Sequence, residues 1–466
     1  MRACFAYPPM RIINPATGEV LREVAEADRV AVTAACRRAR AAQPAWAATS
    51  LGTRCEVIRR WRALAVERAE PLARTLALEV GKPIAQARRE LAGVLPRVDF
   101  FLAEIEGALA PEVVLTSPGD HLDEMIRREP LGVVANISAW NYPWYVGANV
   151  FLPALLTGNA VVYKPSEFAT LTGLAIGELL HEAGVPADVF QVVAGGGSAG
   201  AMLLEEPVDA VCFTGSHATG VKVAAAMAPR LVRVQLELGG KDPVYVCDDV
   251  DVATTAAAVA DGAFYNTGQS CCAVERVYVH ERLWSRFADA FVATVHDYVV
   301  GDPLDERTYI GPLARREAAL DHHEAQVADA LGRGARALTG GRRLERPGFF
   351  FAPTVLVDVD HTMAVMREET FGPLIGLARV GSDDEAVALM NDTAYGLTAA
   401  VYTADRARAE RLLARVNAGT AYWNCCDRVS PRLPWTGRGA SGLGVTLSRE
   451  GIAAFLRPKA WHLRGV

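Results

Sequence analysis

The sequence predicts an α/β protein built on Rossmann-like parallel sheets with helices on both faces. Short apolar strands alternate with helix-length segments from residue 132 to residue 228, and a second series of this kind covers roughly residues 240–420. Such alternation is typical of parallel sheets, because each parallel connection needs a crossover, usually a helix. The 466 residues suffice for two to four structural units at ~100–200 residues per domain.

The N-terminal part is predicted to be helical and to end in a small β element. Residues 27–80 are rich in Ala, Arg and Glu, and apolar side chains such as Ile58 and Trp61 recur there at helical spacing. Gly81-Lys82-Pro83 is a strong helix stop. Residues 112–130 mix Pro, Gly and β-branched residues, which predicts a strand pair.

The first alternating series has four expected strands and three expected helices. The strands are expected at residues 132–138, 160–163, 189–193 and 210–213. The helices are expected at residues 144–157, 170–183 and 217–228. In an open parallel sheet, ligands bind beyond the carboxyl ends of the strands. We therefore expect a ligand there.

The second series repeats the pattern. Its strands are expected at residues 244–247, 276–280, 354–357 and 399–402. Its helices are expected at residues 251–264, 281–298, 313–333 and 404–416. No internal repeat or low-complexity linker separates the two series, so we expect the two units to pack tightly.

Composition excludes several functional classes. The net charge is -6, without a run of like charges, so no nucleic-acid partner is indicated. The N-terminus has no apolar core of signal-peptide length, and no stretch reaches the ~18 apolar residues of a membrane span. We therefore expect a cytoplasmic protein with no membrane partner. The nine cysteines are expected to be reduced, and without C-x-x-C or H-E-x-x-H spacing we expect no metal.

A thiol and a carboxylate are the candidate catalytic groups of the sequence. Cys271 and Cys272 follow Asn266-Thr-Gly-Gln-Ser, where Gly268 lets the backbone turn sharply. A thiolate there could attack a carbonyl, or the two thiols could simply fill core volume. Glu237-Leu-Gly-Gly-Lys places a carboxylate at the end of an apolar stretch. That carboxylate could activate a thiol or a water, or could form an ordinary surface salt bridge.

Together these segments resemble the aldehyde dehydrogenase superfamily. Glu237-Leu-Gly-Gly-Lys and Gly268-Gln-Ser-Cys stand in the family's order. The similarity spans nearly the whole chain, and each further motif is weak alone but specific in this order. These motifs are Asn14-Pro-Ala-Thr-Gly, Glu79-Val-Gly-Lys-Pro, Trp140-Asn-Tyr-Pro, Lys164-Pro-Ser-Glu, Phe213-Thr-Gly-Ser and Glu368-Glu-Thr-Phe-Gly-Pro.

The resemblance implies an NAD(P)-dependent enzyme of the hydrolytic type that oxidises an aldehyde to a carboxylic acid. Cys271 matches the nucleophile that forms a thiohemiacetal and then a thioester. The side-chain amide of Asn141 matches the group that, with the Cys271 backbone N–H, stabilises the oxyanion. Glu237 matches the base that activates water. Two alternatives are a CoA-acylating relative, which Glu237 disfavours, and a catalytically inactive dinucleotide-binding scaffold.

The resemblance also implies a cofactor site. Glu167 would accept a hydrogen bond from a ribose 2′-hydroxyl and repel a 2′-phosphate, which favours NAD, with NADP possible. Gly195, Gly197 and Gly200 fit G-x-G-x-x-G, but no acidic residue clearly follows at the usual distance, so we interpret this match as partly accidental. The implied cofactor contacts are Ile137, Ser138, Trp140, Lys164, Pro165, Ser166, Glu167, Gly195, Phe213, Thr214, Gly215, Ser216, Leu238, Gly239, Glu369 and Phe371.

The sequence leaves the aldehyde open. By resemblance, the substrate contacts are Tyr142, Val146, Asn149, Ser270 and Cys272. Residues 424–434 are also expected to contact the substrate. An Arg of this segment would favour a semialdehyde carboxylate, whereas Asp427 would favour an aminoaldehyde or betaine aldehyde. In the third alternative, the charges of the segment pair with each other. Many relatives carry Trp-Lys at Asn149-Val150, and that Lys is linked to proton relay from the base. Its absence and an altered motif from Leu433 indicate a divergent subgroup.

The resemblance further implies a domain division and an oligomer. Residues 1–111 and 131–239 would form the NAD-binding domain, and residues 240–445 the catalytic domain. Residues 112–130 and 446–466 would form an oligomerisation arm. In relatives such segments extend a neighbour's sheet, so we expect a homodimer or homotetramer.

Overall fold

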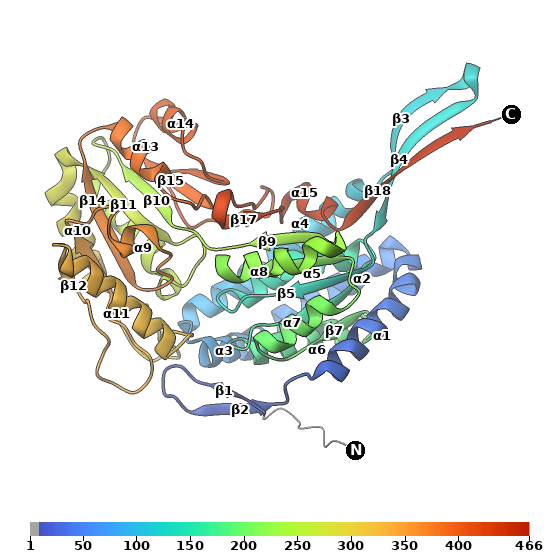
Figure 1. The fold of residues 1–466 in the computed structure, drawn as a ribbon, viewed down its shortest axis with the longest axis horizontal. Helices are drawn as coiled ribbons and strands as arrows, with labels where there is room; N and C mark the ends of the chain where they lie inside the picture. Colours follow the sequence, from blue (N-terminus) through green and yellow to red (C-terminus); the bar gives the residue numbers. More distant parts are fainter. Residues whose placement is uncertain (1–8, 466) are drawn as a thin grey trace.

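The computed structural model describes residues 9–465 and contains a six-stranded, a seven-stranded, a three-stranded and a two-stranded sheet. The two large sheets lie in adjacent units with their own covering helices, and a narrow arm projects away from both (Figure 1). The small sheet pairs β1 (Met10–Ile13) with β2 (Val20–Val24). None of the described helices is long and apolar enough to cross a membrane.

The six-stranded sheet has the order β17-β9-β8-β5-β6-β7, and only its edge strand β17 is antiparallel to its neighbour. The strands are β5 (Val133–Ile137), β6 (Ala160–Lys164), β7 (Phe190–Val192), β8 (Ala210–Thr214), β9 (Arg233–Glu237) and β17 (Gly442–Leu443). All residues of β5 and β6 are buried, as expected for strands covered on both faces. The predicted parallel unit is therefore confirmed, and β9 is a strand that periodicity did not indicate.

Eight α-helices belong to this part of the described chain. They are α1 (Arg29–Ala48), α2 (Leu51–Glu67), α3 (Ala69–Val80), α4 (Ile84–Leu109), α5 (Pro143–Leu156), α6 (Thr170–Ala183), α7 (Gly197–Glu205) and α8 (His217–Met227). The predicted helical region 27–80 is divided into three helices: Ser50 caps the start of α2, and Arg68 separates α2 from α3. Gly81, in the left-handed region, ends α3. Helix α4 was not predicted, and its interior contains Pro96.

The seven-stranded sheet has the order β12-β13-β14-β11-β10-β15-β16. The strands are β10 (Asp242–Val246), β11 (Val274–His280), β12 (Arg336–Thr339), β13 (Thr354–Val357), β14 (Leu374–Val380), β15 (Thr398–Tyr402) and β16 (Thr420–Trp423). The helices are α9 (Val252–Phe264), α10 (Trp284–His296), α11 (Glu317–Gly332), α12 (Ala364–Arg367), α13 (Asp383–Asn391) and α14 (Arg406–Leu413). The sheet is parallel as predicted, except that β12 pairs antiparallel with β13 at one edge.

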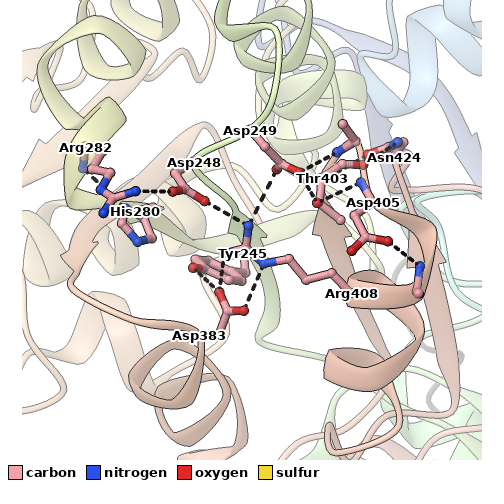
Figure 2. A network of polar contacts seen from close by, with 12 residues as sticks. Tyr245, Asp248, Asp249, His280, Arg282, Asp383, Thr403, Asp405, Arg408 and Asn424 are labelled. Atoms are coloured by element: carbon pink, nitrogen blue, oxygen red, sulfur yellow. Dashed lines mark hydrogen bonds and ion pairs between the residues drawn. The ribbon is translucent and has the colours of Figure 1, made fainter.

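Ion pairs close the carboxyl end of this second sheet (Figure 2). The Arg408 guanidinium donates to Asp248 at 2.8 Å and to Asp383 at 2.5 Å. The Tyr245 hydroxyl donates to Asp383 at 2.8 Å, and the Thr403 hydroxyl donates to Asp249 at 2.7 Å. These bonds attach α13 and α14 to the strand ends. Because Cys271 precedes β11, the thiol lies at the opposite, amino end of the sheet.

The projecting arm is a three-stranded antiparallel sheet. It consists of β3 (Glu112–Ser117), β4 (Leu122–Pro130) and β18 (Leu456–Arg464), in the order β18-β4-β3. The predicted strand pair at 112–130 is present, and the short α15 (Ser448–Ala453) leads into β18. Val113 and Val114 on the arm are 63% and 58% exposed, so the arm presents apolar side chains to solvent.

Candidate active site

The Cys271 loop depends on an unusual backbone turn. Asn266 and Thr267 have positive φ angles, and Gly268 follows with φ +70°. A Cβ on Gly268 would collide with the Gly372 carbonyl, so glycine is required. The Gln269 side chain accepts a hydrogen bond from the Ala314 N–H at 3.0 Å, which holds the loop. Residues 266–270 are buried, whereas Cys271 is partly exposed and accessible to a small molecule.

Three segments that the sequence singled out meet at this loop. A Cβ on Gly240 would lie 2.9 Å from the Cys271 carbonyl oxygen, so the segment after Glu237 packs directly on the cysteine. The Asn266 side chain donates to the Asn141 carbonyl at 3.1 Å and to the Gln269 carbonyl at 3.0 Å. These contacts bring the segments of Cys271, Glu237 and Asn141 together.

A buried ion pair positions Asn141. The Lys82 ammonium donates to the Asn141 carbonyl at 2.7 Å and forms an ion pair with Glu90. Glu90 also accepts from the Trp144 backbone N–H at 3.0 Å, so it fixes the start of α5. Burial lowers the pKa of Lys82 and raises the pKa of Glu90. The Asn141 side-chain amide makes no hydrogen bond within residues 9–465 and can donate to an oxyanion.

Glu237 ends β9 and has an environment suited to a base. Burial raises the pKa of Glu237 to about 7, and hydrogen bonds from Thr446 and Gln235 partly oppose this rise. The carboxylate accepts from the Thr446 hydroxyl, and no described hydrogen bond joins it to Cys271. Its path to the sulfur is therefore through water or through rotation of its side chain.

The two adjacent thiols have different surroundings. The Cys272 thiol donates to Asp427 at 3.0 Å, and Ser270 donates to the same carboxylate at 3.4 Å. The pKa of Cys272 is raised well above its usual value by its hydrogen bond with Cys271, by burial and by the charge of Asp427. Burial raises the pKa of Asp427 to about 6. Cys272 is therefore held as a neutral thiol, which leaves Cys271 as the better nucleophile.

Most implied cofactor contacts lie at the carboxyl ends of the first sheet. Ile137, Lys164 and Thr214 are the last residues of β5, β6 and β8. Contacts just beyond a strand end or within the following turn are Ser138, Trp140, Pro165, Ser166, Glu167, Gly215, Ser216, Leu238 and Gly239; Phe213 lies within β8 and Gly195 before α7. This arrangement agrees with the position expected for a ligand of an open parallel sheet.

The side chains at this edge fit a dinucleotide. Lys164 is buried and lies 3.5 Å from the more exposed Glu167 carboxylate, so both can meet ribose hydroxyls. Ser216 caps the N-terminus of α8, and free helix N–H groups attract phosphate. The Trp140 ring contacts Phe168 and Phe371, with centroids 6.3 and 5.5 Å away.

A second buried ion pair positions Glu369 and Phe371. Lys241 pairs with Glu275 at 2.8 Å, and Glu275 accepts the backbone N–H groups of Thr370 and Phe371 at 2.8 and 2.9 Å. Glu369 in turn accepts from the Gly240 N–H at 3.2 Å. Burial raises the pKa of Glu369 to about 8. Lys241 of the quoted motif is therefore a structural residue.

The glycine-rich loop before α7 is engaged by another acid. Glu26 accepts from the Gly196 N–H at 2.9 Å and from the Ser198 hydroxyl at 2.7 Å. A carboxylate already occupies the start of this helix, where a phosphate would bind in an ordinary Rossmann loop. The Glu26 carboxylate therefore stands where an ordinary Rossmann loop would hold a phosphate.

Implied substrate residues lie at the start of α5 and along it, and Tyr145 between them contacts helix α4 through its hydrogen bond to the Arg89 carbonyl. Tyr142 stacks on Tyr145 with centroids 5.6 Å apart, and Lys82 lies 3.7 Å from the Tyr142 ring centroid. Val146 and Asn149 are buried on the same helix. Residues that the sequence analysis missed here are Glu90 and Arg97, because they belong to the unpredicted helix α4.

The charged residues of segment 424–434 do not act alike. Asp427 turns toward Cys272. Arg428 is exposed and lies 3.9 Å from Asp261. Arg432 is also exposed, and it lines a surface cavity of about 690 Å³ beside the second half of α4. Arg428 also donates to the Asp427 carbonyl at 3.1 Å. Neither arginine forms a described hydrogen bond with Cys271 or Cys272.

Comparisons with known proteins agree with this geometry. The family model described as "Aldehyde dehydrogenase family" matches residues 6–461. A succinate-semialdehyde dehydrogenase [NADP(+)] of Deinococcus radiodurans is 36% identical, over 97% of this chain and 94% of the relative. The peroxisomal aminoaldehyde dehydrogenase 1 of Pisum sativum is 36% identical, over 96% of this chain and 91% of the relative. A crystal structure of an E. coli NADP dependent enzyme superimposes with a TM-score of 0.95 at 35% identity, covering 98% of this chain and 95% of that one.

Proposed function

Since this chain belongs to the aldehyde dehydrogenase family and is an NAD(P)-dependent oxidoreductase of aldehydes, we propose that it is a hydrolytic member that uses Cys271, Asn141 and Glu237. The observation that carries this proposal is the convergence of the three segments on one partly exposed thiol. The product is the carboxylic acid that corresponds to the aldehyde.

The proposed reaction begins with the Cys271 thiolate. The sulfur adds to the carbonyl carbon, and the C=O electron pair moves to the oxygen, where the Asn141 amide and the Cys271 N–H stabilise the charge. NAD held by residues such as Lys164, Glu167 and Glu369 would supply the acceptor for the hydride of that carbon, and loss of this hydride would leave a thioester on Cys271. Glu237 then takes a proton from water, whose oxygen displaces the Cys271 sulfur.

Glu237 also favours the hydrolytic reaction over the CoA-acylating alternative. A CoA-acylating enzyme releases the acyl group to a thiol cofactor and does not need a base for water. A carboxylate with a pKa of about 7 suits water activation near neutral pH. The test is NADH formation with a panel of aldehydes, with and without CoA. Turnover that requires CoA would refute the hydrolytic assignment. Absence of NADH formation with every aldehyde of the panel would indicate an inactive scaffold.

We further propose NAD as the preferred cofactor, with NADP possible. The Glu167 carboxylate beside Lys164 can accept from a ribose 2′-hydroxyl and would repel a 2′-phosphate. Arg316 opposes this preference, because a cation near Glu167 could bind a 2′-phosphate. Its guanidinium lies 5.5 Å from the centroid of the Phe168 ring, and the Glu167 charge acts on it. Parallel kcat/KM values for the two cofactors test the preference.

The arm supports a homodimer or homotetramer. The strand β18 is an edge strand of the arm, and β16 is an edge strand of the seven-stranded sheet, with Trp423 38% exposed. Edge strands carry unpaired backbone groups, so a β18 strand can extend the β16 edge of a second copy. Sedimentation at micromolar concentration tests this, and a monomer would refute it.

The domain division and the location follow the same proposal. We assign residues 1–111 and 131–239 to cofactor binding, 240–445 to catalysis, and 112–130 with 446–466 to the arm. The eight described cysteines are free, which suits the reducing cytoplasm, and Cys4 lies outside the described residues.

A further inference from the structure

Arg97 is a buried cation with unusually few partners. It is 5% exposed and lies on α4, with its guanidinium 3.8 Å from the Tyr145 ring centroid. Its Nη1 donates to the Gly93 carbonyl at 2.7 Å. Its Nε has no hydrogen-bond partner, and within residues 9–465 no carboxylate forms an ion pair with it.

Other buried cations in the described structure are fully engaged. Lys82 pairs with Glu90, and Lys241 pairs with Glu275. Arg54 and Arg276 lack a carboxylate partner but donate their Nε to backbone carbonyls, at 2.9 and 2.8 Å. Arg97 has neither arrangement. Tyr145 and the attraction of Glu90 stabilise the Arg97 charge, but Glu90 already pairs with Lys82, so the Arg97 Nε is left to bind a further partner.

Arg97 lies beside residues implied to contact the substrate. Its guanidinium covers the Tyr145 ring, and that ring stacks on Tyr142, the residue after Asn141. The Arg97 charge also acts on Glu237 and Cys272. Asn149 is on the adjoining helix α5, one turn after Tyr145, and its Oδ1 is also buried without a hydrogen-bond partner. Of these two unpaired atoms, the Arg97 Nε is the donor and can bind an anionic group of a ligand, whereas the Asn149 Oδ1 can only accept a hydrogen bond.

We propose that Arg97 binds the carboxylate of an ω-oxo acid, so that the preferred substrates are semialdehydes whose aldehyde carbon meets Cys271. A guanidinium fork binds a carboxylate through two parallel N–H···O bonds, and an Nε without a partner is available for this. The inference rests on the proposed function, because it assigns the far end of a substrate whose near end reacts at Cys271.

The opposite substrate class, a cationic aldehyde, has weaker support. Asp427 already accepts hydrogen bonds from Cys272 and Ser270, and with a pKa of about 6 it can also be neutralised by a proton. Arg97 cannot be neutralised in this way, since a guanidinium stays charged. An ammonium group at this place would also be repelled by Arg97.

Arg97 has one other conceivable role. Val150 stands where many relatives carry a lysine near the base, and the Arg97 charge lowers the pKa of Glu237. If Arg97 acted only through Glu237, its removal would lower kcat for every aldehyde. If it binds a substrate carboxylate, its removal raises KM for carboxylated aldehydes alone.

The experiment compares three aldehydes of equal chain length. These are 4-oxobutanoate, butanal and 4-aminobutanal, each assayed by NADH formation with the wild type, Arg97→Met, Arg97→Lys and Arg88→Met. Arg88 lies on the same helix but is partly exposed and paired with Glu70 and Glu306, so it is a matched control. Arg97→Met leaves the Lys82–Glu90 pair intact, and circular dichroism and thermal unfolding check that it folds.

We expect the wild type to prefer 4-oxobutanoate. In Arg97→Met, KM for 4-oxobutanoate should rise ~10- to 100-fold, the range of a lost charge-assisted hydrogen bond, with butanal nearly unchanged. Arg97→Lys should recover part of the loss, and Arg88→Met should match the wild type. A uniform fall in kcat, or a wild-type preference for butanal or 4-aminobutanal, would overturn the inference. Absence of NADH formation with all three aldehydes would instead contradict the proposed function.

Discussion

Replacing Glu237 by Gln tests the base directly. The glutamine keeps the size of the side chain but cannot accept a proton from water, so thioester hydrolysis should slow by ~10²–10⁴-fold, the usual contribution of a general base. Burial raises the Glu237 pKa to about 7. The ionised fraction then rises about tenfold between pH 6 and pH 8, so kcat of the wild type should increase through this window and level off above it.

Stopped-flow NADH fluorescence separates the two halves of the reaction. Glu237→Gln should retain a burst of about one NADH per site, because Cys271 attack and hydride transfer precede hydrolysis, whereas the steady rate should lose its rise near pH 7. Thr446→Val is a matched variant that keeps the carboxylate but removes a hydrogen bond that lowers its pKa, so the rise should move to higher pH. A pH-dependent rise that persists unchanged in Glu237→Gln would refute the assignment.

The other predictions concern stability, cofactor choice and assembly. Lys82→Met leaves Glu90 buried without its cation and should lower the free energy of unfolding by about 3–5 kcal/mol, measured in urea. Glu167→Gln removes the negative charge near the ribose and should raise the NADP to NAD ratio of kcat/KM by about tenfold. Deleting residues 456–466 removes β18 and should convert the oligomer into monomers in sedimentation velocity.

Hydrophobic periodicity predicted the strands of the two large sheets better than it predicted helix α4, which carries Arg97. Strands such as β5 and β13 are short apolar runs, and the predicted ranges agree closely with the observed ones. Helix α4 has buried residues at helical spacing, including Leu91, Val94 and Val98, but Pro96 obscured the pattern. Arg97 was missed with it, although an arginine within an apolar helical face is a visible signal.

The motifs predicted which segments meet, but not how they are held. No spacing rule connects Lys82 with Glu90 or with the Asn141 carbonyl, because these contacts depend on how α4 packs on α5. The orientation of Glu237 toward Thr446 likewise depends on a residue far along the chain. Long-range packing decides such contacts, and a single sequence does not reveal it.

The most direct test of the account is to locate the acyl group. Glu237→Gln is mixed with NAD and an aldehyde, quenched in acid and digested, and the peptide that contains both Cys271 and Cys272 is fragmented by mass spectrometry. We predict an acyl mass on the Cys271 sulfur in nearly every subunit. An acyl mass on Cys272, or unmodified peptide after a completed NADH burst, would contradict the account.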